Sequence, residues 1–271
     1  MSSLASRVLV GVPLAVVAIL AVVAGGWPML MLAVVFGLIG MHEYCTMTRE
    51  LRPLTIAGFA GVLGILVAVH QGGLIWSLLP LAATLVLSFW LAVIADVRQA
   101  AVVRLGVTLL GVVWIGLGLG FLLAVRDAPG PGAWGETLLI AVLIGVWLSD
   151  IFAYAGGKLF GRRKLAGDIS PNKTVEGFLF GLVFGTAGVF FWLYRQPDED
   201  PISALNALEF ALAIALTSPI GDLFESYLKR DMGVKDTGRL LGGHGGVLDR
   251  MDALLFAGAA AYFVALALGR A

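Results

Sequence analysis

The sequence predicts an all-α, polytopic integral membrane protein with about nine transmembrane helices and a cytoplasmic N-terminus. Three observations lead to this fold class: a mean hydropathy of +0.96, a composition that is 59% hydrophobic and 13% charged, and a succession of long apolar segments joined by polar connections. Soluble globular proteins are far less apolar. The formal net charge is zero, so bulk charge says nothing about partners, and we expect no nucleic acid among them.

The apolar segments are each roughly 20 residues long, the length that a helix needs to cross a bilayer core. The first follows Arg7 and could be mistaken for a signal peptide, but it is long enough to span and leads directly into the next. The second has the least certain end, because His42, Glu43 and Tyr44 lie there. The single cysteine, Cys45, cannot form an intramolecular disulfide and is interpreted as packing. In chain order the segments cover residues 8–26, 27–47, 53–69, 74–95, 103–125, 137–154, 175–194, 205–227 and 251–268.

Lys and Arg positions predict the orientation, because these residues favour cytoplasmic loops while acidic residues contribute little. With the N-terminus inside, all of the 18 Lys and Arg residues fall on the cytoplasmic side except Arg126, Arg195 and Arg270. We divide the chain into residues 1–135, which hold helices one to five, and residues 136–271, which hold helices six to nine and the two most charged cytoplasmic loops. Any chemistry of these loops is therefore expected at the membrane surface.

Polar side chains of the eighth segment lie on one helical stripe. Asp222, Glu225, Ser226, Lys229 and Arg230 follow the spacing i, i+3, i+4, i+7 and i+8. An i,i+4 ion pair of Glu225 with Lys229, on a helix end outside the bilayer, would explain part of this stripe. It does not explain Asp222, which lies deeper in the segment, where an unpaired carboxylate is costly.

Two further carboxylates open the ninth segment. Asp249 and Asp252 each suit a helix N-terminus, where a carboxylate caps free N–H groups and complements the helix dipole. Together with Asp222 they could instead hold Mg²⁺, a hard cation that takes carboxylate and phosphate oxygens. Both interpretations stay open, because a metal site requires a contact between helices.

A glycine-rich loop around His244, residues 242–246, precedes these carboxylates. Its backbone can approach a phosphate or a base closely and donate N–H groups to it. The loop matches neither the P-loop nor the dinucleotide-binding pattern. In isolation it is equally a flexible turn with a solvated histidine.

The polar connection after the sixth segment carries a second charged pattern. Asp150, Tyr154 and Lys158 lead out of the helix at i, i+4 and i+8, and the basic residues 162–164 follow. These basic residues suit lipid headgroups as well as a substrate phosphate.

Before the seventh segment, Ser170 and Pro171 predict a helix start, with an N-cap followed by Pro at the first helical position. That pattern leaves Lys173 and Glu176 unexplained. Within the segment, the small-residue spacing of residues 177, 181 and 185 predicts a close contact with another helix.

Taken together, the C-terminal charged stretch resembles the signature of the CDP-diacylglycerol synthases, also called phosphatidate cytidylyltransferases. Residues 150–154 and 170–177 are similar to that family too, whereas residues 1–135 match only in being apolar and helical. Gly242 departs from the pattern, because proline is common there in the family. The positions that carry the resemblance are Ser226, Lys229, Arg230, Lys235, Asp236, Gly238, His244, Gly245, Gly246, Asp249, Arg250 and Asp252.

The resemblance implies a multi-pass enzyme of the cell's inner (plasma) membrane with its active site on the cytoplasmic side. It also suggests a homodimer. The enzyme would join CTP to phosphatidic acid with Mg²⁺ or Mn²⁺, and a monovalent cation is left open. Metal ligands are implied at Asp222 and Asp249, with Asp252 as a further candidate. Other catalytic positions are Lys173, Lys229, Arg230 and His244, and those that would bind the nucleotide or its phosphates are Ser226, Lys235, Asp236, Gly245, Gly246 and Arg250.

Two other functions fit parts of the pattern. A CTP-dependent polyprenol kinase would also need basic loops and a metal, but it transfers the γ-phosphate. A transporter would line a substrate path with intramembrane charges, whereas the charges of this sequence cluster at one face. The cytidylyl transfer is favoured, because an anionic phosphate nucleophile needs charge neutralisation more than a general base.

Overall fold

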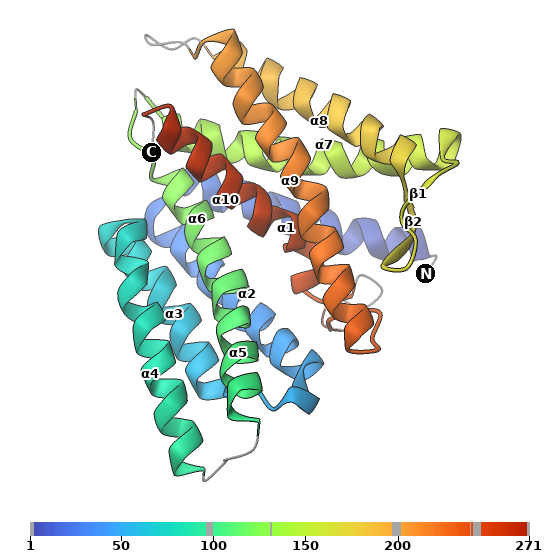
Figure 1. Ribbon diagram of the computed structural model, residues 1–271. Coiled ribbons are helices and arrows are strands. Elements are labelled where there is room, and N and C mark those ends of the chain that lie inside the picture. The colour runs from blue at the N-terminus through green and yellow to red at the C-terminus, as the bar shows by residue number, and fades with distance from the viewer. Residues whose placement is uncertain are drawn as a thin grey trace. The chain divides into compact units, whose positions relative to one another are not determined.

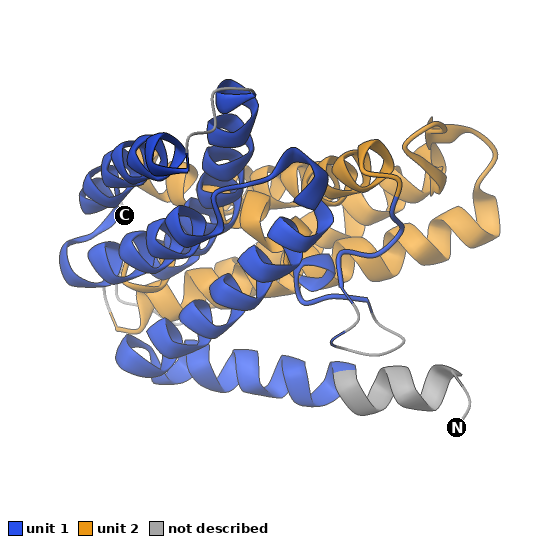
Figure 2. Cartoon of the chain, turned by 90° about the horizontal axis from the view of Figure 1, so that it is seen from below, with its two compact units in different colours: residues 1–124, 234–250 blue, residues 125–233, 251–271 orange. Residues whose placement is uncertain are grey.

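The computed structural model describes residues 3–95, 100–130, 132–196, 202–238, 240 and 245–269. These residues form helices and one small sheet, and they group into two compact units (Figure 2). Unit 1 comprises Met1–Ala124 and Val234–Arg250, and unit 2 comprises Val125–Gly233 and Met251–Ala271. The division into residues 1–135 and 136–271 by role stays a prediction.

Unit 1 is built from apolar helices of the N-terminal half (Figure 1). The segment from residue 101 to residue 126 is continuous, with a π-helical stretch, η3, between α5 and α6, and the last residues of α6 belong to unit 2. Short 3-10 turns connect other helices or follow the glycine-rich loop. The helices are α1 (Ser3–Ala24), α2 (Gly26–Met47), α3 (Thr55–Gly72), α4 (Leu78–Ile94), α5 (Ala101–Gly111) and α6 (Gly118–Arg126), with η1 (Arg49–Leu51), η2 (Leu74–Ser77), η3 (Val112–Leu117) and η5 (Leu248–Arg250).

The end of α2 is anchored inside unit 1. The buried Tyr44 donates its hydroxyl to the backbone oxygen of Val107 in α5 at 2.8 Å. Its ring also packs against Gly111, where an added Cβ would lie 2.6 Å from Tyr44 Cε1. Cys45 is buried beside it without a disulfide, as expected for a packing residue. The second apolar segment is therefore helical to Met47, through the polar residues that made its end uncertain.

Unit 2 contains the longest helices and the sheet (Figure 1). Its elements are α7 (Trp134–Phe160), β1 (Lys164–Ala166), β2 (Ser170–Thr174), α8 (Val175–Tyr194), α9 (Ala204–Asp231) and α10 (Asp252–Ala267). The predicted small-residue contact is confirmed, because α8 approaches α7 through its glycines. An added Cβ at Gly177 would lie 2.6 Å from the backbone oxygen of Ala153, and one at Gly181 would lie 2.7 Å from that of Ser149.

The small sheet corrects one expectation. The described residues are predominantly helical, as predicted, with one short antiparallel pair, β1 and β2, added to the helices. The helix start predicted at Ser170 and Pro171 is wrong, because both lie in β2, where Pro needs no N–H partner at a sheet edge. The helix α8 begins after Thr174, whose hydroxyl oxygen accepts a hydrogen bond from the Gly177 N–H at 3.1 Å.

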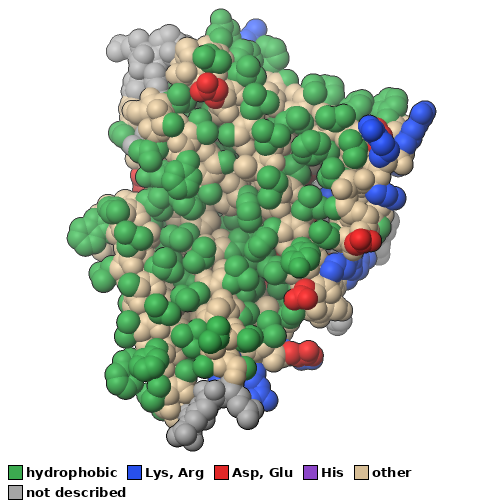
Figure 3. Space-filling view, in the orientation of Figure 1, with side chains coloured by type: hydrophobic (Ala, Val, Ile, Leu, Met, Phe, Trp, Pro, Cys, Tyr) green, Lys and Arg blue, Asp and Glu red, His purple; other side chains and the backbone are tan. Residues whose placement is uncertain are grey.

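Among the described residues, seven helical segments are long and apolar enough to cross a membrane. They are Gly26–Met47, Thr55–Gly72, Leu74–Ile94, Ala101–Arg126, Trp134–Phe160, Val175–Tyr194 and Ala204–Asp231, and two shorter apolar helices are Gly11–Ala24 and Asp252–Ala267. Hydrophobic side chains cover most of the visible face in Figure 3. These features support the predicted multi-pass membrane protein, while the count of nine and the orientation stay predictions.

Candidate active site

The predicted site residues fall into two groups, one in each unit. Unit 2 holds Lys173, Asp222, Ser226, Lys229, Arg230 and Asp252, and unit 1 holds Lys235, Asp236, Gly245, Gly246, Asp249 and Arg250. His244 and the departing Gly242 lie outside the described residues.

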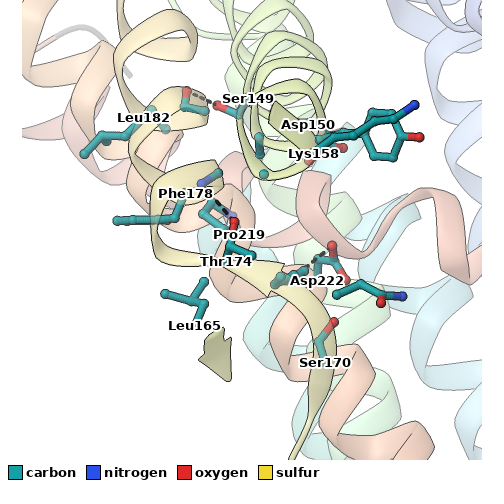
Figure 4. Close-up of a pocket in the computed structure, with 18 residues that line it drawn as sticks. Ser149, Asp150, Lys158, Leu165, Ser170, Thr174, Phe178, Leu182, Pro219 and Asp222 are labelled. Carbon is teal, nitrogen blue, oxygen red and sulfur yellow. Dashed lines mark hydrogen bonds and ion pairs between the residues drawn. The ribbon is translucent and has the colours of Figure 1, made fainter. Parts of the chain in front are cut away.

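A pocket of about 560 Å³ lies within unit 2, lined by residues of α7, β1, β2, α8 and α9 (Figure 4). Its volume is in the range of small-molecule sites. The lining residues that we single out are the polar Asp150, Tyr154, Lys158, Ser170, Asn172, Lys173, Thr174 and Asp222, and the apolar Leu165, Phe178, Leu182 and Pro219. The pocket thus offers both charged groups and an apolar wall, which an amphipathic substrate requires.

An ion pair lies at this pocket. Lys173 Nζ, on β2, is 2.7 Å from Asp222 Oδ2, on α9, and the two side chains are 23% and 38% exposed. The other oxygen of Asp222 accepts a hydrogen bond from Ser226 Oγ at 3.3 Å, one helical turn further on. Because the pair is partly exposed, it contributes little to stability. Asp222 is the more exposed partner at the pocket, whereas the Lys173 Nζ atom itself is buried.

Glu225 and Asp252 form a buried acidic cluster next to Asp222. The predicted i,i+4 pair is confirmed, with Lys229 Nζ 2.9 Å from Glu225 Oε2, and the Glu225 side chain is 1% exposed. Asp252, 8% exposed, is within hydrogen-bonding reach of the Glu225 side chain and interacts electrostatically with Asp222. The cluster follows from a close approach of α9 and α10, because an added Cβ at Gly221 would overlap the backbone oxygen of Asp252.

The hairpin formed by β1 and β2 is tied to α8 and to α9. Glu176 Oε2 accepts hydrogen bonds from the backbone N–H groups of Arg162 and Arg163, at 3.0 and 3.1 Å, and Arg163 Nε lies 3.2 Å from Glu176 Oε1. Arg230 Nε donates to the backbone oxygen of Ile169 at 3.3 Å. Glu176, which the sequence left unexplained, therefore closes the start of the hairpin. These ties place Lys173 beside α9.

In unit 1, Asp249 closes the segment formed by residues 245–250, which we call the signature segment. Its Oδ2 accepts hydrogen bonds from the Gly246 N–H at 2.7 Å, the Thr237 N–H at 3.0 Å and Thr237 Oγ1 at 2.9 Å. Gly245 has φ +77°, and an added Cβ there would lie 2.6 Å from the same oxygen, so the position requires glycine. The described Lys235, Asp236 and Arg250 are exposed.

The two helix-cap predictions have different outcomes. Asp249 lies in the 3-10 turn η5, three residues before α10 begins, and caps the loop rather than the helix. Asp252 is the first residue of α10, and its Oδ1 accepts from the Ala253 N–H at 2.8 Å. The metal roles of Asp222, Asp249 and Asp252 stay predictions.

The carboxylates of unit 2 offer a partial fit to Mg²⁺. Within the described part of the chain, no group of three or more His, Cys, Asp or Glu side chains could hold a metal ion. Asp222 and Asp252 supply two carboxylates that interact with each other. Mg²⁺ commonly uses one or two carboxylates and completes its shell with water and substrate phosphates. The donor set therefore fits a cation shared with a substrate, and not a closed protein site.

Sequence reasoning missed Glu43 as a site-related residue. Its side chain, on α2, is buried and accepts hydrogen bonds from the backbone N–H groups of Val247 and Leu248. The signal was present, because a carboxylate inside an apolar run is costly unless it has a partner. From the sequence, Glu43 marks only the uncertain end of the second apolar segment.

The fold and the site define a class: a helical, membrane-type protein with a pocket lined by charged and apolar side chains. The chain belongs to the cytidylyltransferase family, whose sequence profile matches residues 5–268. A phosphatidate cytidylyltransferase of Bacillus subtilis (strain 168) is 30% identical over 272 residues, covering 97% of this chain and 98% of the relative.

Two other relatives bear the same name. The Staphylococcus haemolyticus protein is 31% identical over 236 residues, covering 86% of this chain and 87% of its own. The Helicobacter pylori protein is 46% identical over 123 residues, covering 45% of this chain and 44% of its own. The family inferred from the signature is thus confirmed.

Proposed function

We propose that this chain is a phosphatidate cytidylyltransferase, which converts CTP and phosphatidate to CDP-diacylglycerol and pyrophosphate. The observation that carries the proposal is the similarity to the Bacillus subtilis enzyme over 97% of this chain. The pocket with its Lys173–Asp222 pair supports it, because the reaction brings together two highly anionic substrates. This similarity favours cytidylyl transfer over the kinase and transporter alternatives.

In this reaction an oxygen of the phosphatidate phosphate forms a bond with the α-phosphorus of CTP. The bond from that phosphorus to the oxygen bridging the β-phosphate breaks, and pyrophosphate leaves with the electron pair. The nucleophile is already anionic near neutral pH, so the site needs orientation and charge neutralisation more than a strong base. Lys and Arg side chains supply charge-assisted hydrogen bonds of this kind.

Lys173 and Asp222 would exchange partners when substrates bind. Without substrates, each neutralises the other in the pocket. Lys173 would then contact a substrate phosphate, which leaves Asp222 to bind a cation together with phosphate oxygens. Bound Mg²⁺ or Mn²⁺ would supply further neutralisation of phosphate charge, with Asp249 and Asp252 as further predicted ligands.

The remaining predicted residues would act on the phosphates and the nucleotide. Lys229 pairs with Glu225 in the acidic cluster and would contact a substrate phosphate when substrates bind. Arg230 and Arg250 are exposed cations that would contact phosphates. The nucleotide or the leaving pyrophosphate would be positioned by Ser226, Lys235, Asp236, His244, Gly245 and Gly246.

We place the reaction at the cytoplasmic face of the inner membrane, with the N-terminus inside. The distribution of Lys and Arg supports this orientation. Phosphatidate would enter from the inner leaflet, with Phe178 and Leu182 on the apolar side of the pocket, while CTP arrives from the cytosol. Nine spans, a monovalent cation and a homodimer remain part of this proposal.

The test uses the purified full-length protein in detergent with CTP, phosphatidic acid and Mg²⁺. Pyrophosphate should form only when the lipid is present, and label in the α-phosphate of CTP should appear in the lipid. Transfer of γ-label to a polyprenol would instead identify the kinase. Uptake into vesicles without chemical conversion would identify a transporter.

A further inference from the structure

The C-terminal end of α2 carries a buried carboxylate that contacts the signature segment. From this contact we infer that Glu43 is a positioning residue, which holds the backbone of the signature segment in the geometry needed for cytidylyl transfer. Its catalytic consequence rests on the proposed function, whereas the contact itself does not. Glu43 and the signature segment both belong to unit 1.

Both oxygens of Glu43 are used. Oε1 accepts a hydrogen bond from the Val247 N–H at 3.0 Å, and Oε2 accepts one from the Leu248 N–H at 2.8 Å. The Glu43 residue is 5% exposed, and Val247 and Leu248 are 3% and 0% exposed. Hydrogen bonds to a carboxylate are short and strong, and buried N–H groups that lose their acceptor incur the full desolvation cost. The contact therefore fixes two consecutive peptide groups.

Two glycines of the signature fit around the same carboxyl group. An added Cβ at Gly238 would lie 2.7 Å from Glu43 Cδ, and one at Gly246 would lie 2.6 Å from that atom. Side chains at these positions would occupy the space of the Glu43 carboxyl group. The two glycines are thus explained by the insertion of the Glu43 carboxyl group.

The contact reaches the predicted site through the segment itself. Gly246, the neighbour of Val247, donates its N–H to Asp249 Oδ2, and Asp249 and Arg250 directly follow Leu248. The anchor is also held by packing, because the buried Tyr44 ring at the same end of α2 fits against Gly111 of α5. Loss of Glu43 would leave two buried N–H groups without their acceptor and let the segment open, which would misplace the predicted nucleotide-binding residues.

The structural part is tested by amide hydrogen–deuterium exchange on the full chain in detergent. The amides of Val247 and Leu248 should exchange slowly in the wild-type protein. In Glu43→Gln, which keeps the size of the side chain but replaces one acceptor oxygen by an NH₂ group, their exchange should accelerate by at least about tenfold. Fast exchange of these amides in the wild-type protein, or unchanged exchange in the variant, overturns the inference.

The catalytic part is tested by the same variant with two matched controls. Glu43→Gln should lower kcat/KM for CTP by about tenfold or more, while KM for phosphatidate stays within about twofold. Tyr44→Phe removes a buried hydrogen bond from the same helix end without touching the signature segment, and Glu50→Gln changes an exposed glutamate. Both controls should keep the wild-type ratio of the two substrates' KM values.

Equal kinetic effects of Tyr44→Phe and Glu43→Gln would show a merely structural role and overturn the positioning role. Absence of cytidylyl transfer in the wild-type protein would instead refute the proposed function. The exchange data would then decide by themselves whether Glu43 holds the segment.

Discussion

Asp222 is the residue at which the pocket, the ion pair and the acidic cluster meet. Its two oxygens interact with Lys173 and with Ser226. Its carboxylate also interacts electrostatically with the buried Asp252. A carboxylate in this position can exchange a cationic side chain for a metal ion when an anionic substrate takes the side chain away. Under the proposed function, the chemistry of the site depends on the negative charge of Asp222.

We expect Asp222→Asn to abolish nearly all CTP-dependent lipid product while protein level in membranes stays unchanged. The amide keeps the size of the carboxylate but can neither neutralise Lys173 nor bind a hard cation. Asp231→Asn serves as the control, because Asp231 is an exposed carboxylate at the end of the same helix. Full activity of Asp222→Asn in a radiolabelled-CTP assay would remove the metal role from Asp222.

Lys173, the partner of Asp222 in the ion pair, is expected to contribute to substrate binding. Lys173→Met should weaken substrate binding by about 10- to 100-fold, because a hydrogen bond to a charged group contributes about 1.5–3 kcal/mol. Lys173→Arg keeps the charge and should retain most of the affinity. Steady-state KM values for phosphatidate and CTP measure the effect. Equal KM values in Lys173→Met and the wild-type protein would show that Lys173 contacts neither substrate.

At the scale of elements, the site depends on helices that approach closely. In unit 2, α9 meets α10 at Gly221, α8 meets α7 at Gly177 and Gly181, and the hairpin is closed by Glu176. Small residues allow this closeness in lipid, where packing rather than the hydrophobic effect drives helix association. The acidic cluster exists because two helices come this near.

Gly221→Ala tests the close contact between α9 and α10. The added methyl group would overlap the backbone oxygen of Asp252, and overpacking of this kind typically costs about 1–3 kcal/mol. We expect a lower thermal midpoint in detergent together with reduced activity, because α10 and Asp252 must shift. Gly106→Ala is the control: an added Cβ there meets nothing within 4 Å, and the change should be neutral or stabilising by up to about 1 kcal/mol. Equal midpoints for both variants would contradict the close contact.

For the whole molecule, the orientation in the membrane decides which substrates can reach the site. CTP is charged and stays in the cytosol, so the hairpin and the pocket of unit 2 must face that compartment if the proposed function is right. The distribution of Lys and Arg predicts this orientation.

Cysteine labelling measures the orientation of the chain in the membrane. Cys45 is buried, so the unmodified chain should react little with a membrane-impermeant maleimide in intact cells. Asp168→Cys, in the exposed turn of the hairpin, should be labelled only after the cells are opened, whereas Asp127→Cys, after α6, should be labelled from outside. Labelling of Asp168→Cys in intact cells would reverse the predicted topology.

The sequence by itself determined the apolar helices, the charged stripe of α9 and the family. Long apolar runs are sufficient to predict the apolar helices, because a bilayer admits few backbone structures other than helices. The Glu225–Lys229 pair followed from helical spacing alone, since both residues lie on one helix. The signature was recognisable because its residues are close together in the chain.

The tertiary structure decided the contacts between distant segments. It paired Lys173 with Asp222, placed Pro171 in a strand, and brought Glu43 to the Val247 amide, 204 residues further along the chain. Hydrophobic periodicity specifies which side of a helix is apolar, but in a chain whose helices are apolar all round it does not specify which faces meet. Those faces are selected by glycine contacts and buried hydrogen bonds, which form only when the whole chain has folded.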